Sequence, residues 1–286
     1  MFDGHVDTLL RLRDPHGFRT GAETHADGPR CREAGVRDLA TAVCAEGERD
    51  WRRALDRGME SWRALRGMED PRLHLMLEGA EPLARLDDPE PILADLEMVT
   101  LTWNPANSLA GGVQSDSGLT AEGRNWVRRL ESLGVLLDVS HLCARSRREL
   151  LSVAEGPVVA SHSNAAGLCD HPRNLPDSDI RELAGRGGLV GITFIPSFLG
   201  EDAGMDTVMD HLTYVADLVG IEAVAFGSDF DGIGRLPRGI EGCQSWPGVL
   251  EAMAGRGFTD DEIRAVAAGN WRRLLGSDDR ERGGSP

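Results

Sequence analysis

Histidine and acidic side chains follow several apolar runs of this sequence, at points where strands are expected to end. The first run, FDGHVD, contains His5 and Asp7, and side-chain alternation along a strand puts both on the same face. The runs LMLE, LLDVSH and VVASH deliver Glu78, His141 and His162 in a similar way. An unpaired polar group at the end of a buried strand is costly, so these residues indicate a shared polar site.

Imidazole and carboxylate groups are typical ligands of zinc and similar borderline metals. We expect one ion to be held by His5, Asp7 and Glu78, and a second by Glu78, His141 and His162. The chain contains no lysine, so a carboxylated lysine cannot bridge two ions, and Glu78 is the expected bridge. Two ions would lower the pKa of a bridging water and polarise a carbonyl oxygen, which predicts hydrolysis by a metal-bridging hydroxide.

An acidic residue, Asp229 of GSDFDG, ends the last predicted strand. We expect it to take a proton from the attacking water and pass it to the leaving amine. Asp231 begins the following loop and is the weaker candidate. Each residue singled out so far also has a structural interpretation, since a buried histidine is often a satisfied core residue and Glu78 could pair with an arginine. Their joint occurrence at strand ends favours the metal site.

Strand and helix patterns alternate along the whole chain and would position these residues. Eight strands are predicted over residues 2–7, 36–44, 72–78, 98–103, 134–140, 157–162, 189–195 and 223–229. Helical patterns lie between them, for example over residues 122–133, 143–154, 177–186 and 207–220. This alternation predicts an α/β protein with one (β/α)8 TIM-like barrel domain over residues 1–276, whose strand ends converge at one mouth. An open doubly wound sheet is the alternative, although no Gly-x-Gly-x-x-Gly follows the first strand.

The sequence after the eighth strand predicts a C-terminal helical extension. Thr259 and Glu262 have the spacing of a capping box, which marks the start of a helix. Residues 277–286 are polar and are predicted to form a flexible tail.

Composition excludes several classes of partner. The formal net charge of −16, without a basic patch, argues against nucleic acid binding. The sequence shows neither a secretory leader nor a long apolar segment, so we expect a cytoplasmic protein without a membrane partner. The five cysteines are scattered and are expected to be reduced thiols.

Eight short motifs occur in order along the chain: DGHVDTL, LEGAEPL, LTWNPANSL, LDVSH, ASHSN, HPRNLPD, FGSDFDG and GNWRRLL. This ordered set resembles the renal-type membrane dipeptidase family, whose members are binuclear zinc peptidases with a (β/α)8 fold. The resemblance implies that the five proposed ligands bind two zinc ions and that Asp229 is the acid/base carboxylate. It also implies that Arg173 receives the substrate's free carboxylate, a role suited to a guanidinium fork. Trp103 and Asn104 are expected to contact substrate.

Two positions depart from the family pattern. Trp103 stands where well-known members have a histidine, and an indole donates one hydrogen bond but neither accepts one nor carries a proton. Ile195 stands where a tyrosine is expected. These differences predict a substrate pocket with altered contacts.

The sequence therefore predicts a zinc-dependent dipeptidase with two zinc ions per subunit. Its expected substrates are small dipeptides, including those with a D-residue at the C-terminal side, and the resemblance implies a homodimer. The membrane anchoring of the family is not expected here, because the sequence shows neither a leader nor a C-terminal lipid-anchor signal. Two alternatives stay open: an N-acyl amino-acid amide hydrolase with the same binuclear site, and a barrel that binds metal or ligand without catalysis.

Overall fold

Parallel strands alternate with helices in the computed structural model, which describes residues 1–276. The strands are β1 (Phe2–Val6), β2 (Asp38–Cys44), β3 (Arg72–Glu78), β4 (Leu96–Thr100), β5 (Leu136–Asp138), β6 (Val158–Val159), β7 (Val190–Ile192) and β8 (Val224–Phe226). All eight predicted strands are confirmed, although those after β4 are shorter than expected. The predicted tail over residues 277–286 lies outside the described residues.

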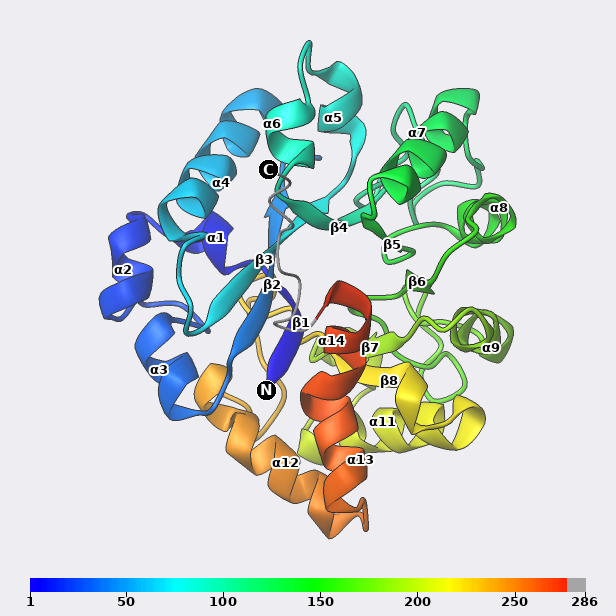
Figure 1. The fold of residues 1–286 in the computed structure, drawn as a ribbon. Coiled ribbons are helices and arrows are strands. Elements are labelled where there is room, and N and C mark those ends of the chain that lie inside the picture. The colour runs from blue at the N-terminus through cyan, green and yellow to red at the C-terminus, as the bar shows by residue number, and fades with distance from the viewer. Residues whose placement is uncertain (277–286) are drawn as a thin grey trace, which may run out of the picture.

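The strands follow one another in chain order. Strands β1–β6 form one curled parallel sheet, and β7 pairs with β8 in a second sheet (Figure 1). Single bridges join Ala160 to Val190, between β6 and β7, and Val6 to Phe230, between β1 and the segment after β8. A doubly wound sheet reverses its strand order at a switch point, so that alternative is wrong for this sequential order.

Helices lie outside the strands and connect them (Figure 1). They are α1 (Thr8–Arg11), α2 (Pro15–Thr20), α3 (Gly28–Glu33), α4 (Trp51–Leu65), α5 (Glu81–Arg85), α6 (Glu90–Leu93), α7 (Ala121–Ser132), α8 (Ala144–Val153), α9 (Asp177–Gly185), α10 (Pro196–Leu199), α11 (Met205–Val219), η1 (Ile221–Ala223), η2 (Cys243–Ser245), α12 (Trp246–Gly255), α13 (Asp260–Arg264), η3 (Ala265–Gly269) and α14 (Asn270–Leu275). The predicted capping box is confirmed, because Thr259 and Glu262 exchange hydrogen bonds at the start of α13. Among residues 1–276, no helix combines the length and hydropathy needed to cross a membrane.

An apolar layer fills the space between the strands at the end where β1 begins. Trp271 of α14 packs there with Phe2, Met76 and Met98. Its indole Nε1 donates a 2.8 Å hydrogen bond to the carbonyl of Phe226. Helix α14 covers this end, and because the strands are parallel, the residues that follow their carboxyl ends lie at the opposite end.

Candidate metal centre

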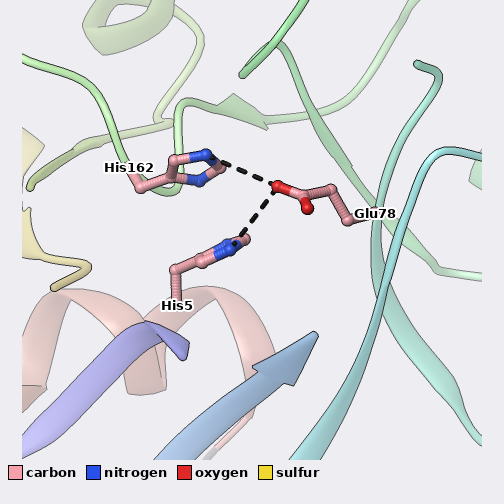
Figure 2. A group of neighbouring side chains, drawn as sticks. All are labelled: His5, Glu78 and His162. Carbon is pink, nitrogen blue, oxygen red and sulfur yellow. Dashed lines mark ion pairs between the residues drawn. The ribbon is translucent and has the colours of Figure 1, made fainter. Parts of the chain in front are cut away.

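One carboxylate oxygen lies among three imidazole rings at the carboxyl ends of the strands. Glu78 Oε1, at the end of β3, lies 3.6 Å from both His5 Nε2 and His162 Nε2 (Figure 2). It lies 2.8 Å from His141 Nε2, which follows β5. All four residues are buried. The structure thus brings the predicted bridge and the three predicted histidine ligands together.

Two further carboxylates face His5. Asp7 Oδ2 and Asp229 Oδ1 lie 3.7 and 3.9 Å from its Nε2 atom. A Cβ atom on Gly232 would lie 2.1 Å from Asp229 Oδ1 and 2.2 Å from Asp7 Oδ2, so both carboxylates occupy space that only glycine leaves. Potential ligand atoms form two groups, and within each group the atoms lie within 4.8 Å of one another. The groups are His5, Glu78 and His162, and His5, Asp7 and Asp229.

Hydrogen bonds to the Nδ1 atoms test whether these residues suit a metal ion. His141 Nδ1 lies 2.9 Å from Asn104 Oδ1, so a ring with its proton on Nδ1 would donate to Asn104 and leave Nε2 for a cation. Arg173 Nη2 donates to His162 Nε2 at 2.7 Å, so a neutral His162 carries its proton on Nδ1. The Nε2 atoms of His141 and His162 lie 2.9 Å apart, beside Glu78 Oε1. Acceptor atoms that converge in this way suit a bound cation.

Unpartnered polar atoms point to the same conclusion. His5 Nε2 and Asp7 Oδ1 are buried and have no hydrogen-bond partner among the described residues. Buried polar atoms in proteins are nearly always paired, and unpaired ones call for an explanation such as an ion. The nitrogen and oxygen donors of the cluster are those zinc prefers. The residues therefore fit a metal ion.

The electrostatics differ across the cluster, favouring positive charge at His5 and a neutral ring at His162. Burial alone would lower the pKa of His5, but the carboxylates of Asp7 and Glu78 raise it to about 10. Burial alone would raise the pKa of Glu78, but His141, His5 and Arg173 lower it to about 2, so Glu78 is ionised at neutral pH. Burial, followed by the charge of Asp7, raises the pKa of Asp229 well above its usual value. Burial lowers the pKa of His162, which keeps this ring neutral, the form that binds metals.

Backbone strain is concentrated at the same end of the strands. His141, Asp229 and Asp231 are the non-glycine residues with positive φ angles among the described residues, at 69°, 63° and 70°. Such angles are unfavourable for residues with a Cβ atom and occur often at functional sites. Here they follow β5 and β8, directly where candidate site residues leave the strands.

The predicted substrate-binding residues surround the cluster. Arg173 is buried, with its guanidinium against His162 and 5.5 Å from the ring centre of Phe198. Trp103 is half-buried and its ring centre lies 6.4 Å from that of His141. Asn104 contacts the imidazole of His141, so in this structure it orients a candidate ligand. Contact of these residues with substrate stays a prediction.

The weaker candidate, Asp231, makes contacts different from those of Asp229. Its carboxylate accepts hydrogen bonds from the Thr8 hydroxyl at 2.5 Å and the His25 backbone at 2.7 Å. It lines a cavity of about 540 Å³ beside α1 and α2, and none of the five proposed ligands lines that cavity. Asp231 therefore fixes the loop around His25.

Sequence reasoning missed three polar residues that support the site. Asp3, Asp138 and Ser161 are fully buried. Asp3 accepts hydrogen bonds from the hydroxyl and the backbone amide of Ser228, at 2.6 and 2.8 Å. The alternation that identified His5 and Asp7 also places Asp3 on their face, so the signal was present. For Ser161, which precedes His162 directly, strand alternation gives the opposite face and hides the contact.

The family of the chain follows from its sequence match. The sequence profile of the membrane dipeptidase family, peptidase family M19, matches residues 76–282. The chain belongs to this family. This confirms the resemblance drawn from the motifs. Metal dependence of the family agrees with the candidate ligand groups at the strand ends.

Relatives of known sequence or structure agree with this assignment. A dipeptidase of Aspergillus oryzae is 34% identical over 175 residues, which are 60% of this chain and 42% of that protein. An uncharacterised dipeptidase of Schizosaccharomyces pombe is 34% identical over 173 residues, 59% of this chain and 42% of the relative. The matches thus span less than half the length of these curated relatives.

Two solved structures are similar over nearly their whole length. A family M19 dipeptidase superimposes with a TM-score of 0.87 at 27% identity, covering 96% of this chain and 97% of the other. A metallopeptidase from Rhodobacter sphaeroides, liganded with a phosphinate mimic of the dipeptide L-Ala-D-Ala, gives 0.86 at 26% identity, with the same coverage.

Proposed function

We propose that this protein is a zinc-dependent dipeptidase that hydrolyses the peptide bond of small dipeptides, including those with a D-residue at the C-terminal side. The observation that carries the proposal is the convergence of the Nε2 atoms of His5, His141 and His162 on Glu78 Oε1, with His5 Nε2 left without a hydrogen-bond partner among the described residues. Membership of the membrane dipeptidase family supports the reaction, and the L-Ala-D-Ala mimic bound to the Rhodobacter relative supports the substrate class.

The proposed centre holds two zinc ions. One would be held by His5, Asp7 and Glu78, and the other by Glu78, His141 and His162, as the distances around Glu78 Oε1 support. When bound, the ions would polarise the scissile carbonyl and lower the pKa of a bridging water, so that hydroxide forms near neutral pH. We also propose that the two single bridges beside β7 and β1 complete a (β/α)8 barrel around this centre.

Residues around the centre would bind the substrate and move its protons. Asp229 would take the proton of the attacking water and deliver it to the leaving amine nitrogen, since its Oδ1 atom faces the cluster beside His5. Arg173 would pair with the free carboxylate of the dipeptide through its guanidinium. The half-buried Trp103 indole would cover one side of the bound substrate. Cytoplasmic location and dimer formation stay predictions from the sequence.

The test measures metal content and dipeptide hydrolysis together. Zinc-loaded wild-type protein should hydrolyse L-Ala-D-Ala or L-Ala-L-Ala, and a chelator should abolish that activity until zinc is restored. Asp229→Asn should keep its metal and lose about 10²–10⁴-fold in kcat. Asp231→Asn is the matched control, and its kcat per folded molecule should stay within about tenfold of wild type.

Three results would contradict the proposal. Zinc-loaded protein without turnover on dipeptides would favour a binding barrel without catalysis. Preference for N-acetylated over free dipeptides would favour the amide hydrolase. Full activity of Asp229→Asn would refute the assigned proton transfer.

A further inference from the structure

A single serine hydroxyl lies between two of the candidate histidine ligands. Ser161 Oγ is 2.7 Å from His162 Nδ1 and 3.2 Å from His5 Nδ1. The serine is completely buried, and the two rings lie with their centres 3.8 Å apart. In the proposed centre, His5 belongs to one zinc site and His162 to the other. The hydroxyl therefore contacts one ligand of each site, on the ring nitrogen that faces away from Glu78.

The hydrogen-bonding capacity of a hydroxyl suits a position between two imidazole Nδ1 atoms. His162 receives a hydrogen bond on Nε2 from Arg173, so its Nδ1 carries the proton and donates to Ser161 Oγ. A hydroxyl oxygen has two acceptor sites and one donor. It can thus accept from both Nδ1 atoms when both Nε2 lone pairs face the centre, and no apolar side chain could replace it there.

The backbone around Ser161 is held by three neighbouring strand segments. Its amide donates a 3.0 Å hydrogen bond to Asp138 Oδ1 at the end of β5. Its carbonyl oxygen packs so closely that a Cβ atom on Gly191 or Gly227 would lie 2.0 or 1.9 Å away. These contacts leave the serine little freedom, so the position of the hydroxyl is set before any ligand binds.

Asp138 extends the same support to the third histidine. Its Oδ1 atom also accepts a 2.8 Å hydrogen bond from the amide of Ser140, the residue before His141. One carboxylate oxygen thus ties together the two segments that carry His141 and His162. Partners of this kind orient metal ligands and fix their tautomers. Their loss typically lowers metal affinity about 10–100-fold.

We propose that Ser161 is a positioning residue that couples the two metal sites by fixing the orientation of one histidine ligand in each. This inference rests on the proposed binuclear centre. Removal of the hydroxyl frees both imidazoles at once, so both ions should be held less tightly. A residue that served only one site would affect one ion.

The experiment measures the release of zinc from the loaded protein into excess chelator, with Ser161→Ala compared to wild type. Both ions should leave about 10–100-fold faster from the variant. Ser163→Ala is the matched control, because Ser163 is equally buried, lies two residues away, and its hydroxyl has no hydrogen-bond partner among the described residues. Its release rates should stay within about twofold of wild type.

Denaturant unfolding of the metal-free variants separates positioning from general damage to the fold. Both serine variants should unfold at similar denaturant concentrations. Unchanged zinc release from Ser161→Ala would overturn the positioning role, and faster release of one ion alone would overturn the coupling. A wild-type protein that retains no zinc would instead refute the proposed function, so the two failures are distinguishable.

Discussion

Buried histidines lie beside carboxylates at both ends of the strands, but their ring nitrogens are fully hydrogen-bonded at only one of these ends. At the end where the strands begin, His74 Nδ1 lies 2.8 Å from Glu97 Oε2, and His74 Nε2 lies 3.4 Å from Asp38 Oδ1. Arg272 of α14 completes this group with a 2.6 Å hydrogen bond to Asp38 Oδ2. Both ring nitrogens of His74 therefore have acceptors, and Asp38 has two donors.

The metal centre has the same residue types in a different arrangement. There, the Nε2 atoms of His141 and His162 lie 2.9 Å apart, and His5 Nε2 has no hydrogen-bond partner among the described residues. A group whose hydrogen bonds are satisfied contributes to folding, whereas buried polar atoms without partners are unfavourable until a ligand such as a cation binds. The comparison teaches that pairing, and not residue type, separates a stabilising cluster from a binding site.

The largest effect is expected from the carboxylate at the centre. Glu78→Gln removes the negative charge shared by three imidazoles, so the protein should lose bound zinc and about 10³-fold or more of its kcat/KM. Metal analysis and dipeptide hydrolysis measure both. The matched change at the other end, Glu97→Gln, should leave both properties close to wild type. Retention of two zinc ions by Glu78→Gln would break the comparison.

An intermediate effect, on stability, is expected at His74. Burial alone would lower its pKa, but Asp38 and Glu97 raise it to about 9, above the unfolded value of 6.5. A raised pKa stabilises the fold fully below the unfolded value, and this contribution is lost as pH rises through about 9. His74→Gln should therefore lower the unfolding free energy by roughly 1–3 kcal/mol near pH 6 and by much less near pH 10.

Denaturant unfolding of both proteins at the two pH values provides the measurement. Zinc content and activity per folded molecule should not change in His74→Gln, because the ring lies at the other end of β3 from Glu78. A stability difference that grew with pH would contradict the assignment of a protonated His74.

The smallest effect is expected at Trp103, beside the centre. Its ring packs on Gly47, where a Cβ atom would lie 2.9 Å from the indole. Trp103→Ala should raise KM about 3–10-fold with kcat within about twofold, because it removes apolar contact but no proton carrier. Steady-state kinetics on L-Ala-D-Ala give the values. A fall in kcat as large as that of Asp229→Asn would place the indole in the chemical step.

Much of the site was predictable because strand alternation and strand ends are local signals. His5, Asp7 and Glu78 were found from apolar runs that end in metal-ligand types, and the structure brings them together. The contact of Asn104 with His141 was not predictable, because it joins the loop after β4 to the residue after β5. Ser161 was missed because alternation along the predicted strand 157–162 puts it on the face opposite His162, whereas the strand in the structure ends at Val159.

The sequence by itself determined the order of strands and helices and which residue types end each strand, because hydrophobic periodicity and helix caps act between near neighbours in the chain. Only the tertiary structure decided which atoms face one another at the centre. Those contacts join residues far apart in the chain, such as His5 and Ser161, which are 156 positions apart, and depend on how the sheet curls and how its strands are aligned. No local pattern carries that information.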